Sequence, residues 1–324
     1  MTMAIEVKDL RKSYGTNEVL KGIDLKVKQG SVFAVLGPNG AGKTTLVQIL
    51  STLLRPTRGS VKVLGMEVQR EASAIRRKIS LTGQFASVDE DLSGKENLMM
   101  IARLMGYRRK AARSRADELL QIFGLTDAGD RPVTSYSGGM RRRVDIAAGM
   151  IETPDLLFLD EPTTGLDPRS RGQVWEIVRR LVGQGTTVLL TTQYLEEADQ
   201  LAGRIAVLDH GMVIAEGTPA ELKASVGSGS VQVRIDLAEQ REAAAAVLGK
   251  VFHNELHFGS DPAMLSVRSD DPEHAALALI ELKRAGISHS HFSIGQPSLD
   301  EVFLALTGRP STDESASKEK EVIQ

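Results

Sequence analysis

The chain has 324 residues, no cysteine, a formal net charge of −2 at pH 7 and a pI near 6.3. Without cysteine, disulfide frameworks and thiol chemistry are excluded, and the near-zero net charge gives no electrostatic footprint for nucleic acid. The length is sufficient for one large domain and a smaller one. No apolar run in the sequence is long enough to cross a bilayer, so a membrane process would need its spans from another polypeptide.

Two stretches near the N-terminus, 4–10 and 19–27, alternate apolar and polar residues. This period of two predicts half-buried strands. A nearly all-apolar run follows at 31–36 and predicts a strand that is buried on both faces. We therefore expect an antiparallel edge sheet beside a buried core strand.

The next segment fits the phosphate-loop pattern G-x-x-x-x-G-K-[ST] at every fixed position. It consists of Gly37, Pro38, Asn39, Gly40, Ala41, Gly42, Lys43, Thr44 and Thr45. The glycines let backbone N–H groups point at phosphate oxygens, and the helix expected next directs its positive end at the same anion. Lys43 supplies a cation for the β- and γ-phosphates, and the Thr44 hydroxyl can join the shell of a magnesium ion. The segment predicts binding of a nucleoside triphosphate.

Further apolar runs predict strands at 61–65, 79–84, 155–160 and 187–192, and a helical pattern from about 94 to 123 separates the second from the third. Three of these runs end in polar side chains, which are Gln84, the pair Asp160 and Glu161, and Gln193. Ligands of open α/β sheets bind at the carboxyl ends of the strands. We therefore expect these side chains near the phosphate loop. A hairpin is expected at 204–216.

Beyond a Gly/Ser linker at 227–230, the pattern reads strand, helix, two short strands, helix and strand, over 231–294. This β-α-β-β-α-β order predicts a small, ferredoxin-like α+β module, and a helix at 298–306 follows it. The polar stretch 309–324 lacks a periodic apolar face, which predicts disorder. The expected parts are a nucleotide-binding domain at 1–226 with a helical subdomain at about 86–153, an accessory domain at 227–308 and a disordered tail at 309–324.

The order of these motifs, with the phosphate loop first and the paired acids at 160–161 near the end, resembles the nucleotide-binding subunit of an ABC transporter. Ser137-Gly138-Gly139 matches the signature of that family, and Gly165-Leu166-Asp167 matches the turn that follows its paired acids. The phrases YSGGMRRR at 136–143, LTTQYLEEAD at 190–199 and SLDEVFLALTG at 298–308 are similar to the daunorubicin-resistance type of exporter ATPase. The resemblance implies an ABC-type α/β P-loop ATPase with a mixed core sheet, an antiparallel edge sheet and a helical insertion.

The resemblance implies catalytic roles at matching positions. Asp160 would hold Mg²⁺ as a hard oxygen ligand, and Glu161 would act as the general base or orient the attacking water. Gln84 would reach the metal and the attacking water and sense the membrane partner. Most of the superfamily has a histidine where this chain has Gln193, whose amide can donate a hydrogen bond but cannot relay a proton. We therefore expect Glu161 to carry most of the hydrolytic chemistry and turnover to be modest.

The resemblance also implies a site split between two chains. Tyr14 would stack on adenine, and Ser137, Gly138 and Gly139 would contact the γ-phosphate of ATP held by a second copy. Asp167 would bridge the two copies near the phosphate loops. The implied cofactors are ATP and Mg²⁺. The implied partners are a second copy of the chain and an integral-membrane permease, with the chain peripheral to the cytoplasmic face of the plasma membrane and no nucleic acid expected.

Three functions remain open from the sequence. The first is the ATPase of an exporter for a drug-like or lipid-like substrate. The second is a non-transport ABC ATPase that acts on ribosomes or DNA, but such proteins usually have two ATPase halves or a long coiled-coil insertion, whereas this chain has one phosphate loop and no sustained heptads. The third is an importer subunit, and the phrase at 298–308 favours the exporter branch over it by resemblance.

Two further features have simple interpretations. Arg141, Arg142 and Arg143 predict a solvated helix face after the signature. His289 and His291 are two apart on an expected strand, which predicts that both rings share one face. Because no third ligand lies nearby in sequence, metal binding is not favoured there.

Overall fold

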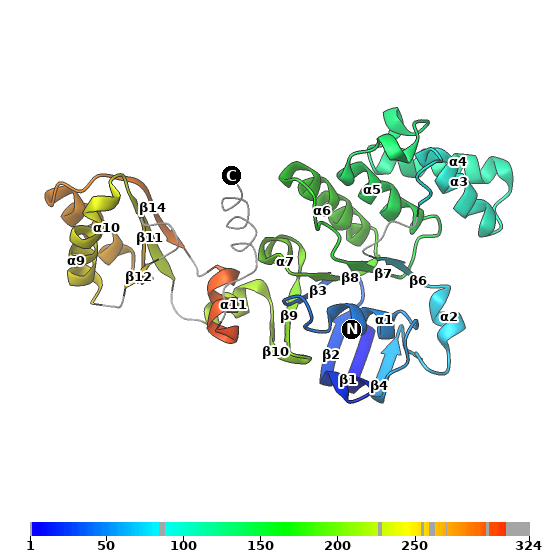
Figure 1. Cartoon of the computed structure of the whole chain (residues 1–324), viewed down its shortest axis with the longest axis horizontal. Helices are drawn as coiled ribbons and strands as arrows, with labels where there is room; N and C mark the ends of the chain where they lie inside the picture. Colours follow the sequence, from blue (N-terminus) through cyan, green and yellow to red (C-terminus); the bar gives the residue numbers. More distant parts are fainter. Residues whose placement is uncertain are drawn as a thin grey trace. The chain divides into compact units, whose positions relative to one another are not determined.

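The computed structural model describes residues 2–83, 88–225, 229–253, 256–258, 263–269, 271–295 and 298–308. Gln84 and the tail at 309–324 lie outside the described residues. The chain divides into two compact units, with the boundary between Pro219 and Ala220. Figure 1 shows the elements of each unit in the colours of the sequence.

The first unit is built on a six-stranded sheet with the order β10-β9-β3-β8-β7-β6. Its strands are β3 (Val32–Leu36), β6 (Ile79–Thr82), β7 (Leu156–Asp160), β8 (Thr187–Thr192), β9 (Arg204–Asp209) and β10 (Met212–Gly217). Strands β9, β3, β8, β7 and β6 run parallel to one another, and β10 pairs antiparallel with β9 at one edge. Every residue of β3 and β7 is buried, as a strand covered on both faces requires. The expected mixed core sheet is confirmed.

A second, antiparallel sheet has the order β2-β1-β4-β5, and its strands are β1 (Met3–Tyr14), β2 (Asn17–Lys28), β4 (Arg58–Val63) and β5 (Met66–Glu67). This is the edge sheet that the alternating N-terminal pattern predicted. Its inner side chains share one hydrophobic core with the central sheet, and Ile5, Leu25 and Phe33 are members of that core. Helix α1 (Lys43–Leu50) contributes Leu46 to the same core. The helix after the phosphate loop is therefore anchored to both sheets.

The other helices of the first unit are α2 (Ala72–Arg76), α3 (Gly94–Leu104), α4 (Arg109–Ile122), α5 (Gly138–Ala148), α6 (Pro168–Gly183) and α7 (Leu195–Leu201), with 3₁₀ turns at Thr126–Ala128 and Val133–Ser135. Helices α3, α4 and α5 contact one another and gather into a helical block (Figure 1). Ser93 and Glu96 close a capping box at the start of α3. In the described part of the chain, no helix combines the length and apolar character that a membrane span needs.

The second unit has a four-stranded antiparallel sheet with the order β12-β13-β11-β14. Its elements are α8 (Pro219–Ser225), β11 (Ser230–Ile235), a 3₁₀ turn at Ala238–Gln240, α9 (Arg241–Phe252), β12 (Leu256–Phe258), β13 (Met264–Arg268), α10 (Pro272–Arg284), β14 (His289–Gly295) and α11 (Leu299–Thr307). Val231 and Val233 of the sheet share a core with Leu248 of α9 and Leu282 of α10. The predicted β-α-β-β-α-β order is present, with the split βαβ arrangement of ferredoxin-like modules.

The prediction that His289 and His291 share one face is wrong. Arg234 of β11 pairs with His291, but the next residue, Ile235, pairs with His289, so β14 carries a bulge. Cross-strand partners share a face of the sheet. His289 therefore lies on the face of the buried Ile235, and His291 lies on the face of the exposed Arg234. The extra residue of the bulge shifts the alternation, and the described residues contain no cluster of three His, Asp or Glu that could hold a metal.

The β9–β10 turn supports the phosphate loop through Gly211. Its N–H donates to the Ala41 carbonyl oxygen at 3.1 Å, and its own carbonyl accepts from the Lys21 N–H at 2.9 Å. The φ angle of Gly211 is 81°, and an added Cβ would overlap the Val19 carbonyl oxygen. Only glycine fits at this junction between the turn, β2 and the loop.

We predict that Gly211→Ala lowers the free energy of unfolding of the first unit by about 2–4 kcal/mol, because it adds both a strained φ and a steric overlap. Urea unfolding followed by the fluorescence of Trp175 measures it, since this is the single tryptophan of the chain. The control is Gly185→Ala, where φ is 102° but nothing lies within 4 Å of an added Cβ. The control should lose about 1 kcal/mol, and equal losses in the two variants would contradict the role of Gly211.

Candidate nucleotide site

The phosphate loop turns tightly between the end of β3 and the start of α1. The Gly37 N–H donates to the carbonyl oxygen of Thr192, at the end of β8, at 3.2 Å. A Cβ at Gly37 would overlap the Leu208 carbonyl oxygen, and one at Gly42, where φ is 108°, would lie 2.7 Å from Leu20 Cδ2. Backbone that approaches its neighbours this closely forms a cradle without side chains, which is what a bound phosphate requires.

Lys43 and Glu161 form a buried ion pair beside this cradle. The Nζ of Lys43 lies 3.2 Å from Glu161 Oε1, and the side chains are 4% and 6% exposed. Lys43 also donates to the carbonyl oxygens of Gly37 at 2.8 Å and Pro38 at 3.2 Å. The structure therefore places the ammonium that would bind phosphate next to the carboxylate predicted to act on water.

Glu161 has a constrained backbone and side chain. Its φ of 49° lies in the left-handed region, which non-glycine residues occupy mainly where surrounding contacts enforce it, often at functional sites. The Glu161 N–H donates to the Thr191 carbonyl oxygen at 3.0 Å. The Thr164 hydroxyl lies 3.3 Å from Glu161 Oε2, to which it donates. These contacts orient the carboxylate toward the phosphate loop.

Thr191 links the two predicted acids, and sequence reasoning did not identify it. It is the in-register neighbour of Asp160 across β7 and β8. Its hydroxyl donates to Asp160 Oδ1 and accepts from the Glu161 N–H at 3.2 Å. Asp160 is 4% exposed and Thr191 is fully buried. The only sequence signal was a threonine near the end of an apolar strand, two residues before Gln193.

The remaining predicted residues of this edge have different environments. Gln193 follows β8, and its buried Oε1 has no hydrogen-bond partner among the residues that the structure describes. A buried amide oxygen without a protein partner fits contact with a ligand or water. Tyr14, at the end of β1, is 48% exposed, and the Lys12 ammonium lies 5.0 Å from its ring centre. Among the residues that the structure describes, no hydrogen bond, ion pair or ring contact joins Tyr14 to the phosphate loop.

The signature segment begins helix α5. Ser137 is the N-cap, and its side chain accepts from the Met140 N–H at 3.3 Å. Gly139 lies against Ser170, since an added Cβ would overlap the Ser170 hydroxyl. In the described part of the chain, no hydrogen bond or ion pair joins residues 137–139 to the phosphate loop at 37–45. The helix end is an anion site in principle, but it is not assembled with the phosphate loop within one chain.

Asp167 is the N-cap of α6. Its carboxylate accepts from the Ser170 N–H at 3.0 Å and from the Ser170 hydroxyl at 2.6 Å. Hydrogen bonds from the Ser170 hydroxyl and then its N–H lower the pKa of Asp167. Because Ser170 also contacts Gly139, the Asp167 turn and the signature lie next to each other.

The prediction of a solvated face at Arg141–Arg143 is wrong for two of the three residues. The Arg142 side chain is 11% exposed and donates to the carbonyl oxygens of Gly83, Asp160 and Pro162. Arg143 donates to carbonyl oxygens at the end of α4. Burial is the largest cause that lowers the pKa of both guanidinium groups. The physical reason is that carbonyl groups at the ends of strands and helices need donors, and long arginine side chains reach them.

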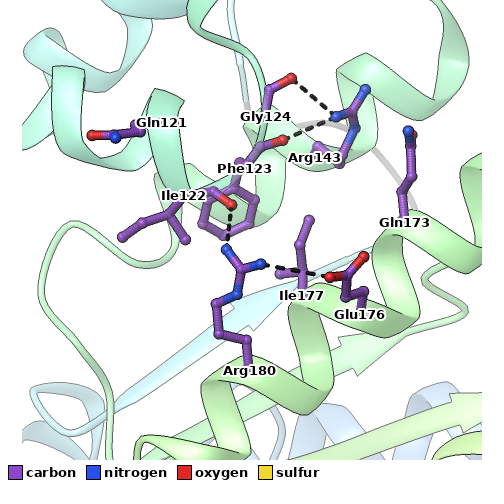
Figure 2. Close-up of a pocket in the computed structure, with 9 residues that line it drawn as sticks. All are labelled: Gln121, Ile122, Phe123, Gly124, Arg143, Gln173, Glu176, Ile177 and Arg180. Carbon is purple, nitrogen blue, oxygen red and sulfur yellow. Dashed lines mark hydrogen bonds and ion pairs between the residues drawn. The ribbon is translucent and has the colours of Figure 1, made fainter.

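Figure 2 shows how two arginines cap the last carbonyl groups of α4. Arg143 donates to Phe123 at 2.9 Å and to Gly124 at 3.2 Å, and Arg180 of α6 donates to Ile122 at 3.2 Å. A pocket of about 250 Å³ lies among these groups, and its lining also includes Gln121, Gln173, Glu176 and Ile177. No residue of the phosphate loop lines it. The pocket belongs to the joint between the helical block and α6 and not to the nucleotide site.

Glu197 is a buried carboxyl group that sequence reasoning also missed. It is fully buried on α7 and accepts from the Thr163 hydroxyl at 2.9 Å and from the Trp175 indole N–H at 3.2 Å. Burial raises the pKa of Glu197, opposed by hydrogen bonds from Thr192, Thr163 and Trp175 and by the charge of Arg142. The turn at Thr163, which follows Glu161, is thereby tied to the helix that follows Gln193.

Comparison with known proteins now gives the family. Residues 20–164 match the family described as ABC transporter, and residues 217–307 match the C-terminal domain described as ATP-binding protein DrrA1-3-like. The chain is 57% identical over 323 residues to the daunorubicin/doxorubicin resistance ATP-binding protein DrrA of Streptomyces peucetius, which covers 98% of each chain. The chain belongs to the ABC transporter ATP-binding family.

Two other relatives support this assignment. The Nod factor export ATP-binding protein I of Ralstonia nicotianae is 36% identical over 326 residues and covers 96% of each chain. A solved dimer of the ATP-binding cassette MJ0796 with ADP and Pi has a TM-score of 0.61 and 27% identity, and covers 66% of this chain and 98% of its own. Family membership confirms the predicted ABC-type fold and the predicted ATPase activity, in which the chain binds ATP. The roles of individual residues stay predictions.

We predict that Thr191→Val lowers the free energy of unfolding by about 1.5–3 kcal/mol, because it removes a hydrogen bond from a buried carboxylate. It should also weaken binding of Mg-ATP, since Asp160 and the Glu161 backbone lose their shared partner. Urea unfolding and equilibrium dialysis measure the two effects. The control is Thr187→Val at the other end of β8, where the hydroxyl accepts from the Gly30 N–H. Unchanged affinity for Mg-ATP in Thr191→Val would contradict the role of Thr191 in holding Asp160 and Glu161 in place.

We predict a pH-dependent effect of Glu197→Gln. A carboxyl group whose folded pKa is raised above its unfolded value of about 4.5 contributes stability that is present below that pH and is lost as the pH rises through the folded pKa. Glutamine keeps an acceptor oxygen and cannot ionise, so the variant should gain stability relative to wild type as the pH rises from about 5 to 8. Urea midpoints by circular dichroism measure this shift. Exposed Glu196→Gln is the control, and a parallel shift in both variants would contradict the assignment.

Proposed function

We propose that this chain is the ATP-hydrolysing subunit of an exporter and drives a drug-like or lipid-like molecule through a separate integral-membrane permease. The observation that carries the proposal is the buried group of Lys43, Asp160 and Glu161 beside a backbone cradle that admits no side chain. Two relatives support the export part, because one is named for resistance to daunorubicin and doxorubicin and the other for export of Nod factor.

The residues of the site fit ATP with Mg²⁺. Thr44, Asp160 and Gln84 would supply the oxygen ligands that Mg²⁺ prefers. When bound, the ion would neutralise negative charge on the phosphate groups. The cradle at Gly37–Gly42 would hold the phosphates with backbone N–H groups, and Tyr14 would stack on adenine. Gln193 Oε1 is buried and has no hydrogen-bond partner among the described residues, which supports a position where its amide group would face the ligand.

Hydrolysis would follow from the placement of Lys43 and Glu161. Lys43 would donate to a γ-phosphate oxygen, and Glu161 would accept a proton from the attacking water or orient it. Thr164 and Thr191 hold the side chain and backbone of Glu161 through the contacts given above. Gln193 would donate a hydrogen bond and could not carry a proton, so the general base would be Glu161 alone.

We propose that two copies of the chain enclose two ATP molecules. In the described ranges no hydrogen bond or ion pair joins the signature at Ser137, Gly138 and Gly139 to the phosphate loop. A second copy would bring the two anion sites together, with Asp167 at the junction. The dimeric relative with ADP and Pi supports this arrangement. The complex would lie peripherally at the cytoplasmic face of the plasma membrane, where a permease supplies the spans.

We propose separate roles for the two domains of the chain. The nucleotide-binding domain would comprise 1–226 with its helical subdomain at about 86–153, and the accessory domain at 227–308 would stabilise or regulate the dimer. The match of residues 217–307 to a C-terminal domain of DrrA1-3-like proteins supports the separate character of this part.

We predict that Glu161→Gln lowers ATP turnover by about 10²–10⁴-fold while Mg-ATP binding persists, because only the proton acceptor is lost. Size-exclusion chromatography with Mg-ATP should show a trapped dimer in the variant and a transient one in wild type. Exposed Glu152→Gln is the control and should behave as wild type.

Gln193→Ala should reduce turnover less than Glu161→Gln does. The reverse order would overturn the assignment of the base. If neither protein forms a dimer, repeating the experiment with the membrane partner separates a need for that scaffold from an incorrect two-copy site.

A further inference from the structure

A single side chain joins helix α5 to three backbone carbonyl groups at or just after the carboxyl ends of β6 and β7. Arg142 of α5 donates to the carbonyl oxygen of Gly83 at 2.6 Å, of Pro162 at 2.9 Å and of Asp160 at 3.2 Å. Two of these carbonyl groups lie on either side of Glu161 along the chain, and the third belongs to the residue before Gln84. The guanidinium group therefore fixes the backbone on both sides of the predicted base.

The same group belongs to a buried polar cluster. Arg142 lies 3.4 Å from Asp145 on its own helix, where the carboxylate is 1% exposed. Burial lowers the pKa of Arg142, and the negative charges of Asp145, Glu197 and Asp160 oppose this shift. Glu197 in turn accepts from Thr163, two residues after Glu161. A planar guanidinium group can serve several acceptors at fixed angles, which a lysine ammonium cannot do.

The neighbouring arginines have their described partners elsewhere. Arg141 pairs with Glu90 at 3.1 Å and donates to the Thr134 carbonyl at 2.9 Å, and Arg143 donates to Phe123. All of these partners lie inside the helical insertion at about 86–153. Within the described ranges, Arg142 is the one of these three arginines whose hydrogen bonds connect the insertion to the ends of β6 and β7.

We propose that Arg142 is a positioning residue, which transmits the position of the signature helix to Glu161 and to Gly83 in the same chain. The inference rests on the proposed ATPase mechanism and deepens it. When the signature contacts the γ-phosphate held by a second copy, α5 is displaced relative to the sheet, and the forked contacts of Arg142 carry that displacement to the backbone around the base. Hydrolysis then depends on engagement of the signature without any contact between Arg142 and ATP.

The chain contains a reporter for this coupling. Trp175 is the only tryptophan, and its indole N–H donates to Glu197 at 3.2 Å. A rearrangement of the cluster changes the surroundings of the indole ring, so its emission follows the cluster and not the chemical step. In full-length Glu161→Gln protein, where hydrolysis is arrested, we expect Mg-ATP to change the emission of Trp175.

The test compares full-length Arg142→Gln, Arg142→Lys and Arg141→Gln with wild type. Arg142→Gln should lower kcat by about 10²-fold, since misplaced catalytic groups cost about that much, while KM for ATP stays within about threefold. Arg142→Lys should recover part of the loss, and Arg141→Gln should stay within about twofold of wild type. In the Glu161→Gln background, Arg142→Gln should abolish the emission change although equilibrium dialysis still shows Mg-ATP binding.

Several results would overturn the proposal. They are a normal kcat in Arg142→Gln, an equal loss in Arg141→Gln, or an emission change that persists without Arg142. Should Arg142→Gln fail to fold, the Arg142→Lys variant carries the same comparison. Failure of wild type to bind Mg-ATP would instead refute the proposed function, so the two failures are distinguishable.

Discussion

The buried pair of Lys43 and Glu161 is the constraint on which the nucleotide site depends. Two charges withdrawn from water are tolerated only when each has further polar partners. Lys43 finds them in the carbonyl groups of its own loop. The Glu161 carboxylate accepts from the Thr164 hydroxyl, and the Glu161 N–H donates to the Thr191 hydroxyl. These partners come from the ends of β3, β7 and β8, which lie side by side in the sheet. The strand order therefore determines which charges can meet.

Much of this framework could be predicted because its signals are local. Nearly all-apolar runs predicted β3 and β7, and the contiguous motif at 37–45 predicted the tight turn between β3 and α1. Helix α7 was missed because seven residues between two strands give too few turns for a clear period of 3.6. The prediction that His291 shares a face with His289 was wrong because the bulge in β14 arises from strand pairing and cannot be recognised in the sequence of the strand alone.

The supporting residues of the site could not be predicted, because their partners are distant in the chain. Thr191 bonds to Asp160 from 31 residues away, and Arg142 reaches Gly83 across 59 residues. Propensity and periodicity describe what a residue does to its own element, whereas these contacts depend on strand order and on helix orientation. Glu197 shows the same limit, since its neighbour Glu196 has the same chemistry and lies exposed on the same helix.

The run Arg141–Arg143 shows what decides the role of a charged residue on a helix. Successive residues are turned by about 100° around the axis, so three identical side chains leave one helix in three directions. Arg141 pairs with Glu90, Arg143 donates to carbonyl groups at the end of α4, and Arg142 donates to carbonyl groups at the ends of β6 and β7. The carbonyl acceptors at the ends of α4, β6 and β7 are therefore bound by whichever arginine points toward them. Helix α5 is in this way connected through its second turn to the carboxyl ends of β6 and β7, although neither segment encodes the connection alone.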